Sequence, residues 1–189
     1  MSHGHPCLAG PARCAGAHPF DFLHVAQHNC LGSLLVFQLF FQDAVTSSRR
    51  PTCVLIQEPP LVRGSVPSFS GYISFHPPLS LGRPRVATYV DSAVARGLTV
   101  ASRPAPSPLL VEVTLSSPLG ICTTSQKALR IINVYNLPRA AASSAPRLTP
   151  SEIFPPGIVA TLVAGDFNLH HYATDPTSVT TLRLGSYRG

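Results

Sequence analysis

The sequence predicts an α/β protein in which short strands form a two-sheet β-sandwich flanked by helices. Short runs of β-favouring residues recur along the whole chain, whereas only two segments carry the spacing or capping residues of a helix. Many short strands with few helices favour a sandwich over a parallel sheet built from βαβ units. The chain has 189 residues, 44% of them hydrophobic, which suffices for one domain with a buried core.

The chain is expected to begin with a disordered leader, residues 1–20, followed by one domain over residues 21–189. The leader is rich in Gly, Pro, Ala and His and lacks the continuous apolar run of a secretory signal. The first strand of the domain is predicted at Leu23–Asn29, a short strand pattern that closes on polar groups.

A helix is predicted from Ser33 to Val45, with Ser33 as its N-cap. Its apolar positions cover much of its surface, so the helix is expected to pack against a sheet. They are Leu34, Leu35, Phe37, Leu39, Phe41 and Val45.

The remaining strands are predicted from apolar runs bounded by turn residues. These runs are Cys53–Gln57, Tyr72–Phe75, Val86–Val90, Leu98–Ala101, Leu109–Leu115, Leu129–Tyr135 and Ile158–Ala164. A short helix is predicted before the last of them, because Thr149, Pro150 and Glu152 form a capping-box pattern. Asp91 and Glu112 stand outside any motif and are expected to be solvated.

Polar side chains follow three of the predicted strands at the points where the strands end. Asn29 ends the first, Glu58 follows the second, and Asp166 and Asn168 follow the last within the sequence GDFNLHH. Gln57 points to the opposite strand face from Glu58 and is expected to be structural. Gly, Asp and Asn also form tight turns, which is the structural alternative for Asp166 and Asn168.

The chain has only eight acidic residues, so two of them at strand ends are a notable concentration. If the three strand ends meet, one amide and two carboxylates share a site. Oxygen ligands of this kind, few in number, suit Mg²⁺ or Mn²⁺, which keep several waters and accept substrate phosphate. Asp166 would then orient a water, and Asn168 would donate hydrogen bonds to a developing oxyanion.

The ordered motifs QHNC, QEP, RVATYV, NVYN and GDFNLHH resemble those of the endonuclease/exonuclease/phosphatase superfamily. The likeness is nearer to the endonuclease domain of non-LTR (LINE-type) retrotransposons, and it covers roughly Leu23 to Pro176. It implies a deoxyribonuclease I-like fold and Mg²⁺-dependent nicking of DNA, as in target-primed reverse transcription. A reverse transcriptase domain would follow in a full-length element, and a functional protein would work in the nucleus.

The resemblance also implies roles for single residues. Glu58 and Asn29 hold the metal, directly or through water, while Asp166 aligns or deprotonates the attacking water. Asn168 and Tyr135 steady the phosphoryl group. Three further residues are candidates for contacting DNA, namely His170, His171 and Asn136.

One family element has no counterpart in this chain. Relatives end in a strand with a Ser-Asp-His element, whereas no histidine follows His171 here. The resemblance therefore implies a domain that lacks its final strands. Nicking is then expected to be slower than in a complete domain by about 10²–10⁴-fold, the usual contribution of one acid/base group.

Composition agrees with a nucleic-acid partner inside the cell. The formal charge is +6, and thirteen of the fourteen basic residues are arginine, which binds phosphate bidentately. Five cysteines without a CxxC spacing argue against zinc and favour a reducing compartment. The most apolar stretch, Leu31–Phe41, is too short to span a membrane.

Two other functions remain open at the level of the sequence. The chain could be an inactive truncated remnant that at most binds nucleic acid, or another phosphoesterase of the same superfamily. The residues of the QEP and GDFNLHH motifs favour the nuclease over another phosphoesterase of the superfamily.

Overall fold

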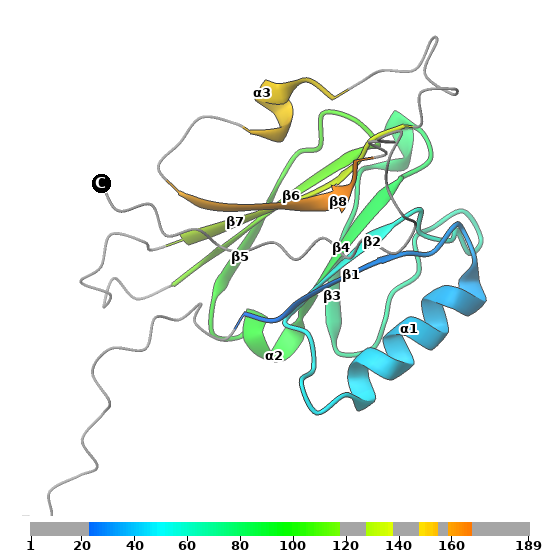
Figure 1. The fold of residues 1–189 in the computed structure, drawn as a ribbon, viewed down its shortest axis with the longest axis vertical. Coiled ribbons are helices and arrows are strands. Elements are labelled where there is room, and N and C mark those ends of the chain that lie inside the picture. Colours follow the sequence, from blue (N-terminus) through cyan, green and yellow to red (C-terminus); the bar gives the residue numbers. More distant parts are fainter. Residues whose placement is uncertain (1–22, 118–127, 138–147, 155–158, 168–189) are drawn as a thin grey trace, which may run out of the picture.

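A computed structural model describes residues 23–117, 128–137, 148–154 and 159–167 (Figure 1). Two four-stranded sheets carry the fold, with strand orders β1-β2-β4-β3 and β5-β6-β7-β8. The strands of the first sheet are β1 Val25–Asn29, β2 Cys53–Gln57, β3 Tyr72–Phe75 and β4 Val86–Asp91. Those of the second are β5 Thr99–Arg103, β6 Leu110–Ser116, β7 Ala128–Tyr135 and β8 Ala160–Asp166. The predicted α/β class is confirmed.

Both sheets are mixed, and each contains one parallel pair. β1 lies parallel to β2 and β7 lies parallel to β8, while the other neighbours are antiparallel. The chain passes from β1 to β2 through the helix α1, Leu34–Thr46. The prediction favoured a sandwich over a sheet built from βαβ units. The observed sandwich nevertheless contains one such unit, β1-α1-β2, at the edge of the first sheet. Parallel neighbouring strands need a crossover connection, and α1 supplies it.

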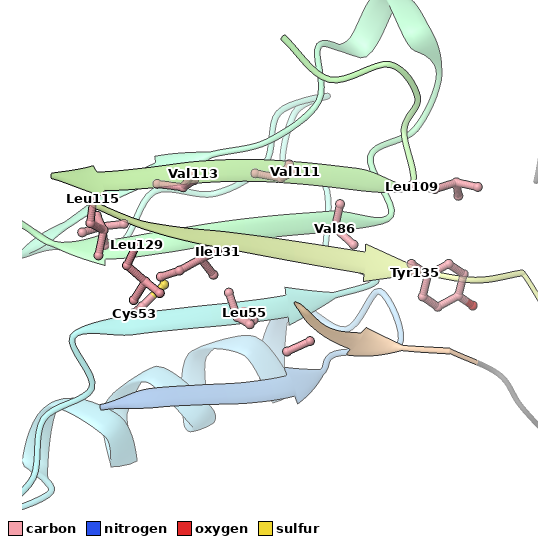
Figure 2. Packing of buried hydrophobic residues seen from close by; sticks show 12 residues of the cluster. Cys53, Leu55, Val86, Leu109, Val111, Val113, Leu115, Leu129, Ile131 and Tyr135 are labelled. Carbon is pink, nitrogen blue, oxygen red and sulfur yellow. The ribbon is translucent and has the colours of Figure 1, made fainter. Parts of the chain in front are cut away.

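The core lies between the two sheets. Apolar side chains from β2 and β4 pack against those from β6 and β7 in one buried cluster (Figure 2). Its fully buried members include Leu55 and Val86 from the first sheet and Val113 and Ile131 from the second. Tyr135, Val86 and Leu109 lie at one end of this core, and Leu115 and Leu129 lie at the other (Figure 2).

Helix α1 covers the outer face of the first sheet, as expected, but with a narrower face than predicted (Figure 1). Its buried residues are Phe37, Phe41 and Ala44, and the two phenylalanines share one buried cluster with Val54, Ile56 and Tyr89. Leu35 and Leu39 are 65% and 52% exposed. Leu34 and Val45 are also exposed. The prediction was wrong for these four because only one side of the helix meets the sheet.

Local signals set the helix ends. Ser33 is the N-cap of α1, and its hydroxyl accepts a hydrogen bond from the amide of Val36. Thr149 and Glu152 form the predicted capping box at the start of α3, Pro150–Ile153. Two short helices were not predicted, namely the 3₁₀ helix η1, Leu79–Leu81, and α2, Ser92–Ala95.

Asp91 and Glu112 are buried and ion-paired, which overturns the expectation that they are solvated. The Arg50 guanidinium lies 2.6 Å from the Asp91 carboxylate. Glu112 lies 3.3 Å from Arg130 and 3.8 Å from Arg103. It also borders a cavity of about 170 Å³ beside β5, β6 and α3. Both acids can be buried because arginines outside their own strands supply their charge partners.

The two cysteines in the described part of the chain are buried thiols. Cys30 and Cys53 are free and buried, and burial raises the pKa of the Cys30 thiol to about 11 and that of Cys53 to about 12.

Among the described residues, no helix combines the length and apolar character needed to cross a bilayer.

Candidate functional site

Four predicted site residues lie at one end of the sandwich, where β1, β2, β7 and β8 finish. The parallel register places Asn29 opposite Gln57, directly before Glu58, and places Tyr135 opposite Asp166. Side-chain bonds then join residues of the two sheets. The chain thus brings together groups that are up to 137 residues apart in sequence.

Asn29 and Asp166 contact each other across the gap between the sheets. The Asn29 Nδ2 group donates to Asp166 Oδ2 at 3.3 Å, and Gln27 Nε2 donates to the main-chain oxygen of Gly165 at 3.0 Å. Asn29 Oδ1 accepts from the amide of Leu31 at 2.9 Å, which forms a tight turn after β1. Asn29 therefore orients the Asp166 carboxylate, and its own oxygen keeps one lone pair for another partner.

Glu58 is held on several sides. Its Oε1 accepts a short hydrogen bond from the Tyr135 hydroxyl, and its Oε2 lies 3.9 Å from the Arg85 guanidinium. Its main chain donates to the Arg85 carbonyl and accepts from the Gly32 amide, both at 2.8 Å. These contacts hold a side chain that is still 21% exposed.

The backbone of Glu58 is strained. Its φ of 45° lies in the left-handed region, and Pro59 follows it, which disfavours helical conformations at the preceding residue. Strain of this kind costs about 1–3 kcal/mol and tends to gather at functional sites. In a regular strand Glu58 would face away from the side to which Gln57 points. The left-handed backbone conformation instead directs the Glu58 side chain toward Tyr135.

Tyr135 is neutral over the whole physiological range. Burial, the hydrogen bond to Glu58 and the charges of Glu58 and Asp166 together raise its pKa to about 12, against a smaller opposing effect of Arg85. The resemblance implies that Tyr135 steadies a phosphoryl group. That role stays a prediction, and in this structure the Tyr135 hydroxyl donates its proton to Glu58.

Asn136 binds the end of β8. Its Nδ2 donates to the Phe167 carbonyl at 2.9 Å, and its amide donates to the Asp166 carbonyl at 2.7 Å. Both bonds anchor the strand that carries Asp166. Asn168, His170 and His171 lie outside the described residues.

Beneath the site, a buried polar network joins the two sheets. Gln57 Nε2 donates to Asn133 Oδ1 at 2.8 Å. Asn133 Nδ2 in turn reaches the carbonyls of Ile56 and Ala87 at 3.3 and 3.0 Å. Gln57 was expected to be structural, and it is fully buried in this network.

Two arginines at the site were not assigned by sequence reasoning. Arg85 precedes β4 and lies beside Glu58, because the antiparallel register pairs Gln57 with Val86. The Arg83 guanidinium lies against Gly32. An Arg-Pro-Arg segment directly before a strand was the available signal, but only the pairing of β4 with β2 shows which motif it faces.

The donor chemistry of the site suits a hard cation. Glu58, Asp166 and the Asn29 carbonyl offer oxygen alone, and Mg²⁺ is commonly bound by one or two carboxylates plus substrate phosphate. Within the described ranges no group of three or more His, Cys, Asp or Glu side chains is placed to hold a metal. A closed all-protein cage is therefore absent from that part of the chain, whereas an open two-carboxylate site fits.

No protein-family model matches this chain, and no curated protein matches it.

Proposed function

We propose that this chain is a Mg²⁺-dependent phosphodiesterase that nicks DNA, with the deoxyribonuclease I-like fold of the endonuclease/exonuclease/phosphatase superfamily. The observation that carries the proposal is the meeting of Asn29, Glu58, Tyr135 and Asp166 at one end of two stacked mixed sheets. Each of these residues belongs to a separate motif of the resemblance. The motifs share no local reason to converge, so their convergence favours a common function.

The residues divide the chemical work. Asp166, oriented by Asn29, would align a water and accept its proton. Glu58 would hold Mg²⁺ with the Asn29 carbonyl, and Tyr135 and Arg85 fix that carboxylate in place. Bound Mg²⁺ supplies Lewis-acid stabilisation of phosphate oxygens and of the leaving 3′-oxygen. Arg85 adds positive charge beside the phosphodiester.

The proposal is tested by following the nicking of supercoiled plasmid with and without Mg²⁺. Asp166→Asn is expected to slow nicking by about 10²–10⁴-fold, because it removes the group that accepts the proton. Asp43→Asn is the matched control, since it removes the same charge from an exposed position on α1. Equal rates for Asp166→Asn and the wild type, or no nicking by either, would contradict the proposal.

A binding measurement separates the metal from the chemistry. Mn²⁺ binding, followed by electron paramagnetic resonance, is expected to weaken in Glu58→Gln and to stay unchanged in Asp43→Asn. A parallel panel of inositol phosphates and sphingomyelin reports on the other phosphoesterases of the superfamily. Hydrolysis of one of these in preference to DNA would overturn the nuclease assignment.

A further inference from the structure

The loop before β4 carries two arginines to the rim of the candidate site. The Arg85 guanidinium lies 3.9 Å from Glu58 Oε2, and its Cζ lies 6.0 Å from the centre of the Tyr135 ring. Arg83 Nη2 lies 2.8 Å from the point that a Cβ on Gly32 would occupy. The two side chains thus reach the two segments that present Asn29 and Glu58.

Those two segments are themselves joined. The Gly32 amide donates to the Glu58 carbonyl at 2.8 Å, so the targets of Arg83 and Arg85 lie side by side. Gly32, with a φ of 71°, has no side chain, and this leaves room for the guanidinium above the turn. Both arginines therefore border one continuous stretch of surface beside the carboxylates.

The backbone of the loop is fixed, while its charged ends stay accessible. The Arg85 amide donates to the Pro108 carbonyl and its carbonyl accepts from Glu58, both at 2.8 Å, and Pro84 between the arginines is buried. The Arg85 side chain is 35% exposed, and Arg83 is exposed. Groups placed in advance lose less conformational entropy when a ligand binds.

Charge balance explains why such a site needs these cations. Glu58 and Asp166 repel any phosphodiester that approaches them. Arg85 shares Glu58 with Tyr135 at a distance longer than a direct hydrogen bond, and within the described residues Arg83 has no acidic partner. Guanidinium groups in this state have donors free for phosphate, which they bind bidentately.

We propose that Arg83 and Arg85 form a two-arginine clamp that binds the phosphates of one DNA strand beside the carboxylates. The clamp rests on the proposed function in that it takes the same polyanionic substrate. It acts in binding and needs no hydrolysis. It also assigns a purpose to the close approach of Arg83 to Gly32, which the candidate chemistry leaves unexplained.

The test is the salt dependence of DNA binding without turnover. A fluorescein-labelled duplex is titrated with protein in EDTA, and fluorescence anisotropy gives the binding constant at a series of salt concentrations. Arg83→Gln and Arg85→Gln are each expected to lower the slope of log K against log[salt] by about 1, and the double variant by about 2. Arg83→Lys and Arg85→Lys should retain most of the slope.

Arg96→Gln is the matched control. It removes the same charge just after α2, beyond the far end of β4 from Arg85, so its slope should equal that of the wild type. Thermal melts of each variant identify any that fail to fold. The clamp would be overturned if the salt slopes of Arg83→Gln and Arg85→Gln matched that of Arg96→Gln. It would also be overturned if the wild type did not bind the duplex.

The outcomes also separate the two proposals. Arginine-dependent slopes without any nicking would leave the clamp standing and refute the hydrolytic function. Nicking that depends on Asp166, together with slopes unchanged by the glutamine variants, would refute the clamp alone.

Discussion

At the scale of single residues, each carboxylate of the candidate site accepts a hydrogen bond from a neutral side chain. Asn29 donates to Asp166, and Tyr135 donates to Glu58. Neither donor carries charge at neutral pH, while the Arg85 guanidinium lies 3.9 Å from Glu58 Oε2. In the proposed function, these hydrogen bonds would orient the two carboxylates toward a metal and toward a water proton.

The proton of Tyr135 provides a direct measure of this arrangement. Its pKa is raised from 10.0 to about 12, so the folded state binds the proton more tightly than the unfolded state. The associated stability is fully present below a pH of about 10 and is lost as the pH rises through about 12. Glu58→Gln is expected to lower this pKa, but to leave it above the ordinary value, because burial is the largest cause.

Tyrosinate absorbance, taken as the difference between each protein and its Tyr135→Phe counterpart, measures the shift. Tyr89, measured in the same way against a Tyr89→Phe counterpart, is the control, since burial raises its pKa and its hydroxyl donates to the Pro67 carbonyl, away from Glu58. An unchanged Tyr135 pKa in Glu58→Gln would show that the hydrogen bond does not act on the phenol.

At the scale of elements, the position of β8 decides where Asp166 lies. β8 pairs in parallel with β7, and Gly165 lies opposite Val134. Gly165 has a φ of 151°, and a Cβ there would lie 1.9 Å from the Val134 carbonyl oxygen. Glycine is therefore required directly before the acid, since any side chain would push the strand end away.

Gly165→Ala is expected to destabilise the fold and to separate Asp166 from Asn29. Gly64→Ala is the matched control, because its φ of 78° is also positive but no atom lies within 4 Å of the added Cβ. Alanine in the left-handed region costs about 1–2 kcal/mol. The clash should cost Gly165→Ala about 1–3 kcal/mol more.

Chemical denaturation gives both free energies of unfolding, and Mn²⁺ binding reports on the position of Asp166. Equal losses in the two variants would mean that β8 shifts without strain. Unchanged Mn²⁺ binding in Gly165→Ala would mean that the strand end does not set the site.

At the scale of the whole molecule, the two sheets are coupled below the site by polar as well as apolar contacts. Asn133 of β7 contacts Gln57 and Ile56 of β2 and Ala87 and Thr88 of β4. Glu58 follows Gln57 directly, and Tyr135 lies two residues after Asn133. The network therefore fixes the two strand ends that meet in the Glu58–Tyr135 bond.

Removing one partner of this network should cost more than removing both. Asn133→Leu leaves the buried Gln57 amide group without its hydrogen-bond acceptor. This is expected to lower the free energy of unfolding by about 1–3 kcal/mol. Gln57→Met alone should have a similar effect on the Asn133 amide. The double variant replaces both groups with apolar side chains of comparable size and should recover the part of the loss that comes from the Gln57–Asn133 pair.

A double-mutant cycle from urea denaturation measures this coupling. Losses that simply add in the double variant would show that the Gln57–Asn133 bond contributes nothing specific. Retained Mn²⁺ binding in the double variant would show that apolar packing alone keeps the strand ends in place.

Features that depend only on neighbouring residues could be predicted from the sequence. Strands β2 and β3 have the predicted limits, and Ser33 and Thr149 cap the helices that they were expected to cap. Strand alternation and capping are local, so a short window of residues contains the whole cause. The same reasoning correctly placed Asn29 and Asp166 at strand ends.

Which strands are neighbours could not be predicted from local sequence and follows from the three-dimensional packing of the chain. Burial and charge partners follow from that pairing, and so the prediction failed for Asp91 and Glu112 and for the exposed leucines of α1. Arg85 reaches Glu58 only because β4 pairs antiparallel with β2 in one register. The pairing is set by the packing of the two sheets over a shared core, and no single segment of the chain carries that information.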